Sequence, residues 1–475
     1  MNNSNTQYHG VKNWQVFAYS AGNLVSNVFL LLMMFVSYLA VGGYGIMTVA
    51  AGYIVTGSRI FDGITDPIVG FIVDKTDSKF GRYRPVMVIG WAVMAAAIFC
   101  MWFFCVGSGI VMFIALYVIY IIGYTLWNTG YNSARNVVTN EPKQRMMVGR
   151  ISALYMLLFA SVFSFYTSNY LIPKHAGINI PALQEMALTA SVVSVICLVI
   201  CVLSLGTKDK PEYYGSTTAE KVTFRDLFKL LKGNRNLQMM IAAAASDKLA
   251  SSTSGNSAIT TMVWGIIVGN YAFQGQLSLI NLIPTILIMF IGTQSAIKKG
   301  NKNATIVYSW VSIVFSLVIV AMFVFGDPTQ IGTSIVVTVI FIIVNILRAG
   351  GMQVTTSIIG PMCADIADYE LYRTGKFVSG MVLSAYTFVD KLVSSLSATL
   401  VGVVIAAIGY STVMPQIGDA STPAILYTAM FLWMGVPVLG WLCSIVAMKW
   451  YDLTPERMQE IQQVNNERKT AAQKA

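Results

Sequence analysis

Long apolar runs separated by short polar or Gly/Pro-rich breaks dominate the sequence. A helix needs about 20 mainly apolar residues to cross a bilayer, and dividing the chain at its polar clusters predicts twelve such spans. The predicted spans cover residues 14–40, 46–73, 85–106, 110–137, 146–171, 186–205, 238–267, 273–297, 303–325, 332–359, 377–408 and 424–449. The pattern therefore predicts an all-α membrane protein.

A long polar stretch, residues 206–236, divides the predicted spans into two sets of six. The domain prediction is an N-terminal six-helix half over 1–205, a middle loop over 206–236, a C-terminal six-helix half over 237–450 and a tail over 451–475. The tail alternates charged and polar residues and is predicted to be a short solvated helix or disordered. Two halves of six helices are typical of transporters built from repeats, whose substrate site lies near the bilayer midplane.

The positions of the basic residues predict the orientation of the chain in the membrane. Most of the 31 Lys and Arg residues lie in the N-terminal segment, the even-numbered loops and the tail. Cytoplasmic loops retain basic residues, so both termini and the middle loop are predicted to be cytoplasmic, with the protein in the inner (plasma) membrane. The net charge of +10 then reflects topology and contact with anionic lipid, and no nucleic-acid partner is expected.

Composition excludes several functional classes. The chain is 56% hydrophobic and 11% charged, whereas soluble domains carry about 25% charged residues. Its two histidines and six cysteines, which form no CxxC pair, provide no metal centre, redox site or Ser-His-Asp triad. No GxxxxGK[ST] motif occurs, which argues against an ATP-driven pump. No enzyme activity, cofactor or bound metal other than a coupling ion is expected.

The second predicted span carries three charged residues, Arg59, Asp62 and Asp66. Each costs at least about 2.5–3.5 kcal/mol at the bilayer centre, so each is a candidate for function. Spacings of three and four place them on one helix face, with the hydroxyl of Thr65 beside them. Two carboxylates and an arginine so placed predict a site for Na⁺ or a shared proton. The alternative interpretation is a structural ion-pair network among helices.

The fourth predicted span has a polar stripe at intervals of four, four and three, made by Tyr124, Asn128, Asn132 and Arg135. Such a stripe must face protein or water and not lipid. Aromatic rings stack on apolar sugar faces while amides and charges bond hydroxyls, so the stripe favours sugar recognition. Hydrogen bonding between helices is the alternative.

Other predicted spans carry charges as well. Adjacent helical residues point about 100° apart, so neither Asp247-Lys248 nor Asp390-Lys391 forms an internal pair, and each charge is predicted to find a partner on another helix. Lys391 is predicted to pair with the span 2 carboxylates. Arg348 lies in span 10, and Arg150 either faces the site or reaches the membrane interface. The six basic and four acidic residues of the spans leave a positive surplus, which an anionic sugar would neutralise, unless Arg135 and Arg150 reach the interface.

Two motifs resemble a known family. The first is Arg59-Ile-Phe-Asp-Gly-Ile-Thr-Asp-Pro-Ile-Val-Gly70, followed by Asp74-Lys-Thr-Asp-Ser-Lys-Phe-Gly-Arg-Tyr-Arg-Pro85. The second, Ala364-Asp-Ile-Ala-Asp-Tyr-Glu-Leu-Tyr-Arg-Thr-Gly375, is similar to a loop between spans 10 and 11. Together with the span count, they resemble the glycoside-pentoside-hexuronide:cation symporters of the major facilitator superfamily.

The resemblance implies the major facilitator fold and a function. A secondary transporter of this family imports a glycoside, pentoside or hexuronide together with Na⁺ or H⁺ by alternating access, and a single chain is expected to suffice. The family's cation site falls on Asp62, Thr65, Asp66 and Thr125. Its substrate residues fall on Tyr124, Asn128, Asn132, Arg150 and Lys391. The remaining charges, Arg59, Asp247, Lys248, Arg348 and Asp390, are expected to form the coupling network.

The chain departs from parts of the family pattern at Asn128 and Asn132, where some members have an aspartate and a tryptophan. This departure argues against a galactoside such as melibiose, and Asn128 resembles the glucuronide-transporting members. The alternative function is transport of a lysolipid or another non-sugar solute on the same fold.

Overall fold

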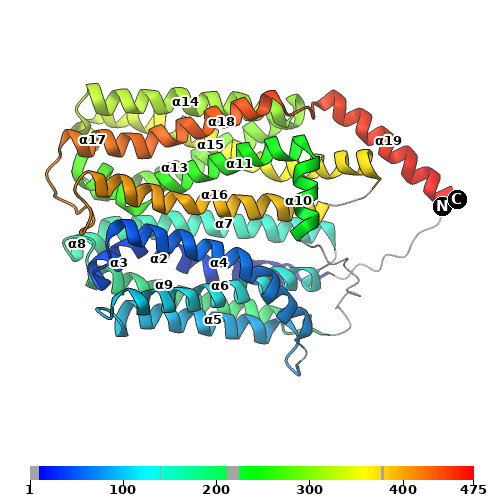
Figure 1. Ribbon diagram of the computed structural model, residues 1–475, viewed down its shortest axis with the longest axis horizontal. Helices are drawn as coiled ribbons and strands as arrows, with labels where there is room; N and C mark the ends of the chain where they lie inside the picture. The colour runs from blue at the N-terminus through cyan, green and yellow to red at the C-terminus, as the bar shows by residue number, and fades with distance from the viewer. Residues whose placement is uncertain (1–9, 77, 140, 211–223, 376–378, 475) are drawn as a thin grey trace. The chain divides into compact units, whose positions relative to one another are not determined.

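In the described part of the chain, the regular structure consists of helices joined by loops and turns (Figure 1). The computed structural model describes residues 10–76, 78–139, 141–210, 224–375 and 379–474. Asp77 of the first motif and residues 211–223 of the predicted middle loop lie outside the described residues. The chain forms two compact units, one comprising Met1–Thr218 and Gly409–Met414 and the other Ala219–Ile408 and Pro415–Ala475.

The helices of the first unit follow the apolar runs closely. They are α1 (Asn13–Ser20), α2 (Gly22–Met33), α3 (Val36–Tyr44), α4 (Thr48–Lys75), α5 (Tyr83–Phe99), α6 (Gly109–Val138), α7 (Pro142–Tyr166), α8 (Ile172–Lys174) and α9 (Ile180–Leu205), with π-helical segments at Cys100–Phe104 and Thr167–Leu171. The apolar runs become helices because only a helix satisfies all of its backbone hydrogen bonds within one membrane-spanning segment.

The second unit has the same character but longer helices. They are α10 (Phe224–Gly233), α11 (Arg235–Ser254), α12 (Ser257–Thr260), α13 (Tyr271–Lys299), α14 (Asn301–Phe325), α15 (Ile335–Thr374), α16 (Ser379–Ala407), α17 (Pro423–Met430), α18 (Val436–Lys449) and α19 (Pro455–Lys474). π-Helical segments lie at Thr261–Ile267 and Phe431–Gly435, and a 3₁₀ turn lies at Pro328–Gln330.

Ten helical segments in the described residues are long and apolar enough to cross a membrane. They correspond to all of the predicted spans except 46–73 and 238–267. These two predictions fall on α4, which carries three charges within the predicted span, and on α11 with the π-helical segment after it, where Asp247 and Lys248 lower the hydropathy. The chain is therefore a multi-pass membrane protein.

The second motif is helical, so the prediction of a loop over 364–375 was wrong. α15 continues through Pro361 to Thr374 because no Gly or Pro occurs between Pro361 and Gly375, which ends the helix with a φ of 72°. Ile366 and Ala367 are buried, so tertiary packing holds the added turns. The prediction that the tail is a solvated helix or disordered also needs correction. The tail forms the helix α19, and one face of this helix is buried.

Glycines allow α5 and α6 to approach closely in the first unit. A Cβ atom at Gly123 would lie 2.5 Å from the backbone nitrogen of Met94, and one at Gly90 would lie 2.6 Å from the backbone nitrogen of Trp127. Small residues at such contacts are how membrane helices pack without a hydrophobic driving force between them. α6 is thereby held along α5.

Asp209, which follows α9, fixes the start of α5. Its carboxylate accepts hydrogen bonds from the backbone N–H groups of Arg82, Tyr83 and Arg84 at 3.1, 3.1 and 2.9 Å. An acid at a helix N-terminus satisfies otherwise unpaired donors and complements the helix dipole. The first motif therefore ends in a capped helix start.

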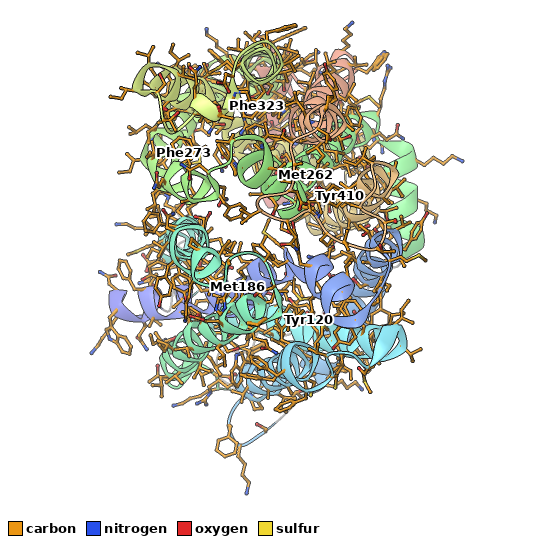
Figure 2. The ribbon with its side chains drawn as sticks, turned by 90° about the vertical axis from the view of Figure 1, so that its left-hand side faces the viewer. Tyr120, Met186, Met262, Phe273, Phe323 and Tyr410 are labelled. Atoms are coloured by element: carbon orange, nitrogen blue, oxygen red, sulfur yellow. The ribbon has the colours of Figure 1, made fainter. Side chains whose placement is uncertain are left out.

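Aromatic rings fill one end of the second unit. Phe273 of α13 and Phe323 of α14, both labelled in Figure 2, pack against Phe341 with ring centroids 6.5 and 6.2 Å apart. Trp264 and Trp433 complete the cluster with edge-to-face contacts. Such contacts stabilise the unit beyond the area that they bury.

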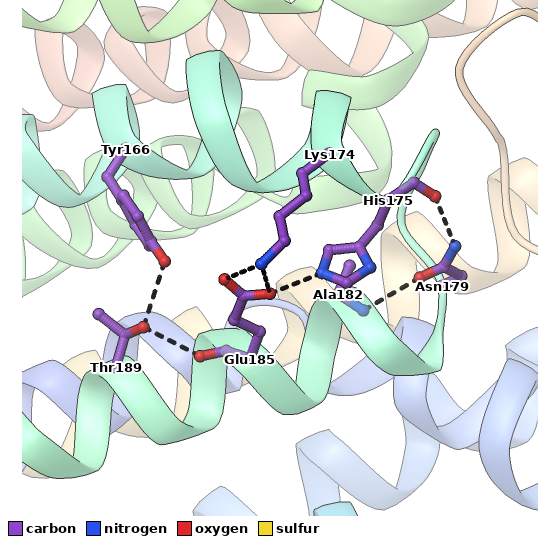
Figure 3. Close-up of polar contacts among 7 residues, drawn as sticks. All are labelled: Tyr166, Lys174, His175, Asn179, Ala182, Glu185 and Thr189. Atoms are coloured by element: carbon purple, nitrogen blue, oxygen red, sulfur yellow. Dashed lines mark hydrogen bonds and ion pairs between the residues drawn. The ribbon is translucent and has the colours of Figure 1, made fainter.

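The connection from α8 to α9 is held by a polar cluster around Glu185 (Figure 3). Its carboxylate lies 2.7 Å from Lys174 Nζ and 2.7 Å from His175 Nε2, and Asn179 donates a hydrogen bond to the carbonyl of His175 at 2.8 Å. His175 thus has a structural partner within its own unit.

Candidate functional site

α4 carries the predicted cation-binding acids on one face. Asp62 is buried, with 2% of its surface exposed, and Thr65 one turn later is also buried. The Thr65 hydroxyl donates a hydrogen bond to the backbone carbonyl of Asp62 at 3.1 Å. Arg59 and Asp66 are half-buried on the same helix. The periodicity of the helix brings these groups together, as the spacing predicts.

α6 provides the partner of the buried acid. Thr125 Oγ1 donates a hydrogen bond to Asp62 Oδ1 at 2.7 Å, and both residues are buried. α4 and α6 pack side by side, so this contact lies inside one unit. A buried carboxylate needs such donors, because leaving it unsatisfied is strongly unfavourable.

Three tyrosines of α6 interact electrostatically with the arginine of α4. The ionisable groups that interact with the Arg59 guanidinium are the hydroxyls of Tyr117, Tyr120 and Tyr124 and the carboxylate of Asp62. The tyrosine rings form a row, with centroids of Tyr117 and Tyr120 6.0 Å apart and those of Tyr120 and Tyr124 6.1 Å apart. Figure 2 labels Tyr120 within the first unit.

Two of these tyrosines are absent from the sequence prediction. Tyr117 and Tyr120 are buried, and the Tyr120 hydroxyl has no hydrogen-bond partner among the described residues. The available signal is the spacing of three from Tyr117 to Tyr120 and of four from Tyr120 to Tyr124, which extends the polar stripe of α6 by two turns. The polar stripe of α6 is therefore longer than the part predicted from the sequence, which begins at Tyr124.

The predicted sugar-binding residues of the first unit fall into two groups. Asn128 is held inside, because Ser26 of α2 donates a hydrogen bond to Asn128 Oδ1 at 3.0 Å. Tyr124 is half-buried, whereas Asn132 on α6 and Arg150 on α7 are exposed. Tyr124 and Asn128 thus lie on the part of the stripe that flanks Thr125, the partner of Asp62. The side chains of Asn132 and Arg150 are exposed.

The predicted network charges of the second unit interact with groups on other helices, with one exception. Asp247 of α11 accepts a hydrogen bond from the Ser444 hydroxyl of α18 at 2.6 Å. Lys248 of α11 interacts electrostatically with Asp390 of α16. The exception is Arg348, whose guanidinium donates to an amide of its own helix, Asn345 Oδ1, at 3.1 Å.

Lys391 of α16 is half-buried in the second unit, whereas Asp62 and Asp66 belong to the first. Its pairing with the α4 carboxylates stays a prediction.

A family profile matches most of the chain. The sequence profile described as MFS/sugar transport protein, where MFS is the major facilitator superfamily, matches residues 16–455. The chain belongs to this family.

Relatives in the family support the resemblance drawn from the motifs. The putative glycoside/cation symporter YagG of Escherichia coli K12 is 24% identical over 90% of this chain and 89% of its own length. The glucuronide carrier protein homolog of the same organism is 21% identical over 96% of each chain. The assignment to glycoside-pentoside-hexuronide-type transporters of the superfamily is confirmed.

The fold matches that of solved transporters. The crystal structure of a bacterial homologue of the human lysosomal transporter Spinster superposes with a TM-score of 0.61 at 14% identity, covering 93% of this chain and 97% of that chain. At this identity the match shows the fold alone. It confirms the predicted major facilitator architecture.

Within this family fold, the α4–α6 face combines four kinds of chemical group. Carboxylates and hydroxyls offer oxygens to a small cation, a guanidinium balances part of the negative charge, and tyrosine rings offer flat surfaces. Asp62 and Thr125, which the sequence places in different spans, meet here within hydrogen-bond distance.

Proposed function

We propose that the protein is a secondary transporter that imports a glycoside, pentoside or hexuronide in symport with Na⁺ or H⁺ by alternating access. The observation that carries the proposal is the buried Thr125–Asp62 hydrogen bond between two membrane helices. Relatives named as a glycoside/cation symporter and a glucuronide carrier support it. No covalent step is involved.

The proposed cation site consists of Asp62, Thr65, Asp66 and Thr125. A carboxylate inside a membrane is expensive unless a counter-charge or a proton compensates it. Arg59 provides part of that compensation, and a bound Na⁺ or proton provides the rest. Binding of the cation is therefore favoured where the protein itself cannot neutralise both acids.

Na⁺ and H⁺ place different demands on the same residues. Na⁺ needs about five or six oxygens, by analogy with other hard cations, whereas a proton needs one carboxylate. The hydroxyls of Thr65 and Thr125 serve the first scheme. Since Thr125 already contacts Asp62 in a buried position, we propose Na⁺ ahead of H⁺ as the coupling ion.

Thr125→Ala is expected to weaken the Na⁺ dependence of sugar binding about ten- to hundredfold, because groups that position a ligand-binding carboxylate act on this scale. Sugar binding is titrated with NaCl against choline chloride at constant pH and ionic strength. Thr189→Ala, which removes a hydroxyl bonded to Tyr166 and not to an acid side chain, is the matched control. Indifference of the parent to Na⁺, together with alkalinisation of the medium on sugar addition, would establish the proton instead.

The proposed sugar site uses Tyr124, Asn128 and Asn132 of α6 with Arg150 and Lys391. A ring for stacking, amides for hydroxyls and cations for an acidic substituent suit a glycoside or a uronide. The charged residues Arg59, Asp247, Lys248, Arg348 and Asp390 are proposed to form the network that links the cation to the substrate.

Among these substrates, charge balance favours the uronide. Arg348 contacts an amide and not an acid among the described residues, and Arg150 is exposed. Each of these guanidinium groups can therefore bind an anionic group without breaking an ion pair between described residues.

A uronide is expected to bind about fivefold more tightly than its neutral glycoside, which corresponds to one partly screened ion pair. Competition in a counterflow assay with proteoliposomes measures the ratio. Arg150→Gln should lower it, whereas Arg457→Gln, which alters an exposed pair with Glu460 on α19, should leave it unchanged. Tighter binding of the neutral glycoside would reject the uronide.

The proposed location is the inner (plasma) membrane with both termini cytoplasmic, and the proposed functional unit is one chain. Basic residues in the even-numbered connections support the orientation.

A further inference from the structure

The second motif, residues 364–375, has no part in the proposed cation or sugar site. Most of its polar groups bind neighbouring helices. The Glu370 carboxylate pairs with Arg373 at 2.9 Å and accepts a hydrogen bond from Asn234 at 2.9 Å. These contacts attach the start of α11 to the end of α15. Asp365 is an acid of the motif that these contacts do not explain.

A cavity of about 300 Å³ lies beside Asp365 in the second unit, among α13, α14, α15 and α19. Most of its wall is apolar, including Ile358 of α15 and Met458 of α19. Thr293, Ser357 and Asn301 add hydroxyl and amide groups. An apolar cavity with a few polar groups is the usual form of a small-ligand site, and this volume is at the lower end of that class.

The Asp365 carboxylate is incompletely compensated. Asn301 Nδ2 donates a hydrogen bond to Asp365 Oδ2 at 2.7 Å, and no ion pair joins Asp365 to a lysine or arginine in the described ranges. Another acid, Asp368, interacts with it electrostatically. A carboxylate in these surroundings attracts a cation that can donate hydrogen bonds.

One wall of the cavity continues into an apolar stripe on α13. Ile297 lines the cavity and is 77% exposed, and Ile283, Leu287 and Phe290 lie on the same helix face and are also exposed. Apolar surface of this kind on a membrane-spanning helix is suited to acyl chains.

The cavity also lies beside positive charge. Lys298 and Lys299 follow Ile297 directly, end α13 and are exposed. Basic residues at the end of a membrane helix lie at the level of lipid phosphates. The same site thus presents an acid inside, bases at its rim and hydrocarbon surface alongside.

We propose that this cavity binds the headgroup of a phospholipid with a primary ammonium, of the phosphatidylethanolamine type. The ammonium donates to Asp365, the phosphate contacts Lys298 or Lys299, and one acyl chain lies along Ile297. The acid, the basic residues and the apolar stripe thus match the ammonium, the phosphate and an acyl chain of that lipid, in that order. This site does not depend on the sugar or on the coupling ion.

The test measures lipid retention by the purified full-length protein with native mass spectrometry. Phosphatidylethanolamine, phosphatidylcholine and phosphatidylglycerol with identical acyl chains are compared. The parent is expected to retain the ethanolamine lipid at least about tenfold better than the choline lipid, because the quaternary ammonium cannot donate to Asp365. Asp365→Asn should remove this preference. Glu460→Gln, which removes an exposed acid paired with Arg457 on α19, should keep it.

Two results would overturn the proposal: equal retention of the two lipids by the parent, or an unchanged preference in Asp365→Asn. Displacement of the lipid by free phosphoethanolamine at equal concentration would also overturn it, in favour of a soluble amine. If Asp365→Asn does not fold, Ser357→Leu fills the cavity while keeping the acid. Loss of the preference in that variant supports the site, and its persistence contradicts it.

Discussion

Asp62→Asn is expected to abolish concentrative uptake of the sugar while some exchange across the membrane survives. Asparagine keeps the volume of the side chain but removes the charge that the proposed Na⁺ or H⁺ compensates. The Thr125 hydroxyl can still donate to the remaining amide oxygen, so the α4–α6 contact is retained. The expected loss is at least about a hundredfold in accumulation, since a buried charge contributes several kcal/mol to cation binding.

The measurement uses proteoliposomes with and without an imposed cation gradient, with the best sugar from a counterflow screen of neutral glycosides, pentosides and uronides. Exchange without a gradient is the internal control for folding. Asp66→Asn is expected to behave in the same way because Asp66 lies on the same face of α4. A variant of either acid that accumulates sugar like the parent would show that the acid does not couple transport.

Gly123→Val is expected to prevent the first unit from folding. The atoms that a new Cβ would meet, at 2.5 and 2.8 Å, belong to the backbone of Met94 and Gly90 and cannot rotate away. α5 and α6 would have to separate, at a cost of about 3 kcal/mol or more. That separation would also displace α6, which carries Thr125 and the tyrosine row.

Size-exclusion profiles and melting temperatures in detergent measure this effect. Gly57→Val is the matched control, because a Cβ atom there meets nothing within 4 Å and valine is a better helix former than glycine. Normal yield and stability of Gly123→Val would show that α5 and α6 do not pack through these glycines.

The charges of α4 illustrate what could be predicted. Arg59, Asp62 and Asp66 are recognisable because charged residues are rare in apolar spans, and their shared face follows from helical periodicity alone. The same charges keep α4 out of the set of strongly apolar helices. The charged groups and the helix face that carries them could therefore both be predicted, because both depend on residues that are close in sequence.

The extension of α15 illustrates what could not. Residues 364–374 are polar and resemble a loop, yet they are helical because α11 and α19 bind them. The docking of α19 was equally hidden, since its apolar positions are few and its partner precedes it by about a hundred residues. Long-range contacts of this kind override local propensity.

The sequence by itself determined that this is a multi-span membrane protein of helices and which spans carry charge, because hydropathy and helical spacing are local properties. The motifs also determined the family, and through it the choice of Thr125. Only the tertiary structure decided which groups interact. Thr125 donates a hydrogen bond to Asp62 across 63 positions of the chain, Lys248 interacts electrostatically with Asp390 on another helix, and Tyr117 and Tyr120 interact electrostatically with the arginine of α4. These contacts depend on which helix faces pack together. The shapes of the buried side chains and the close contacts at glycines determine that packing, and the periodicity of a single helix does not.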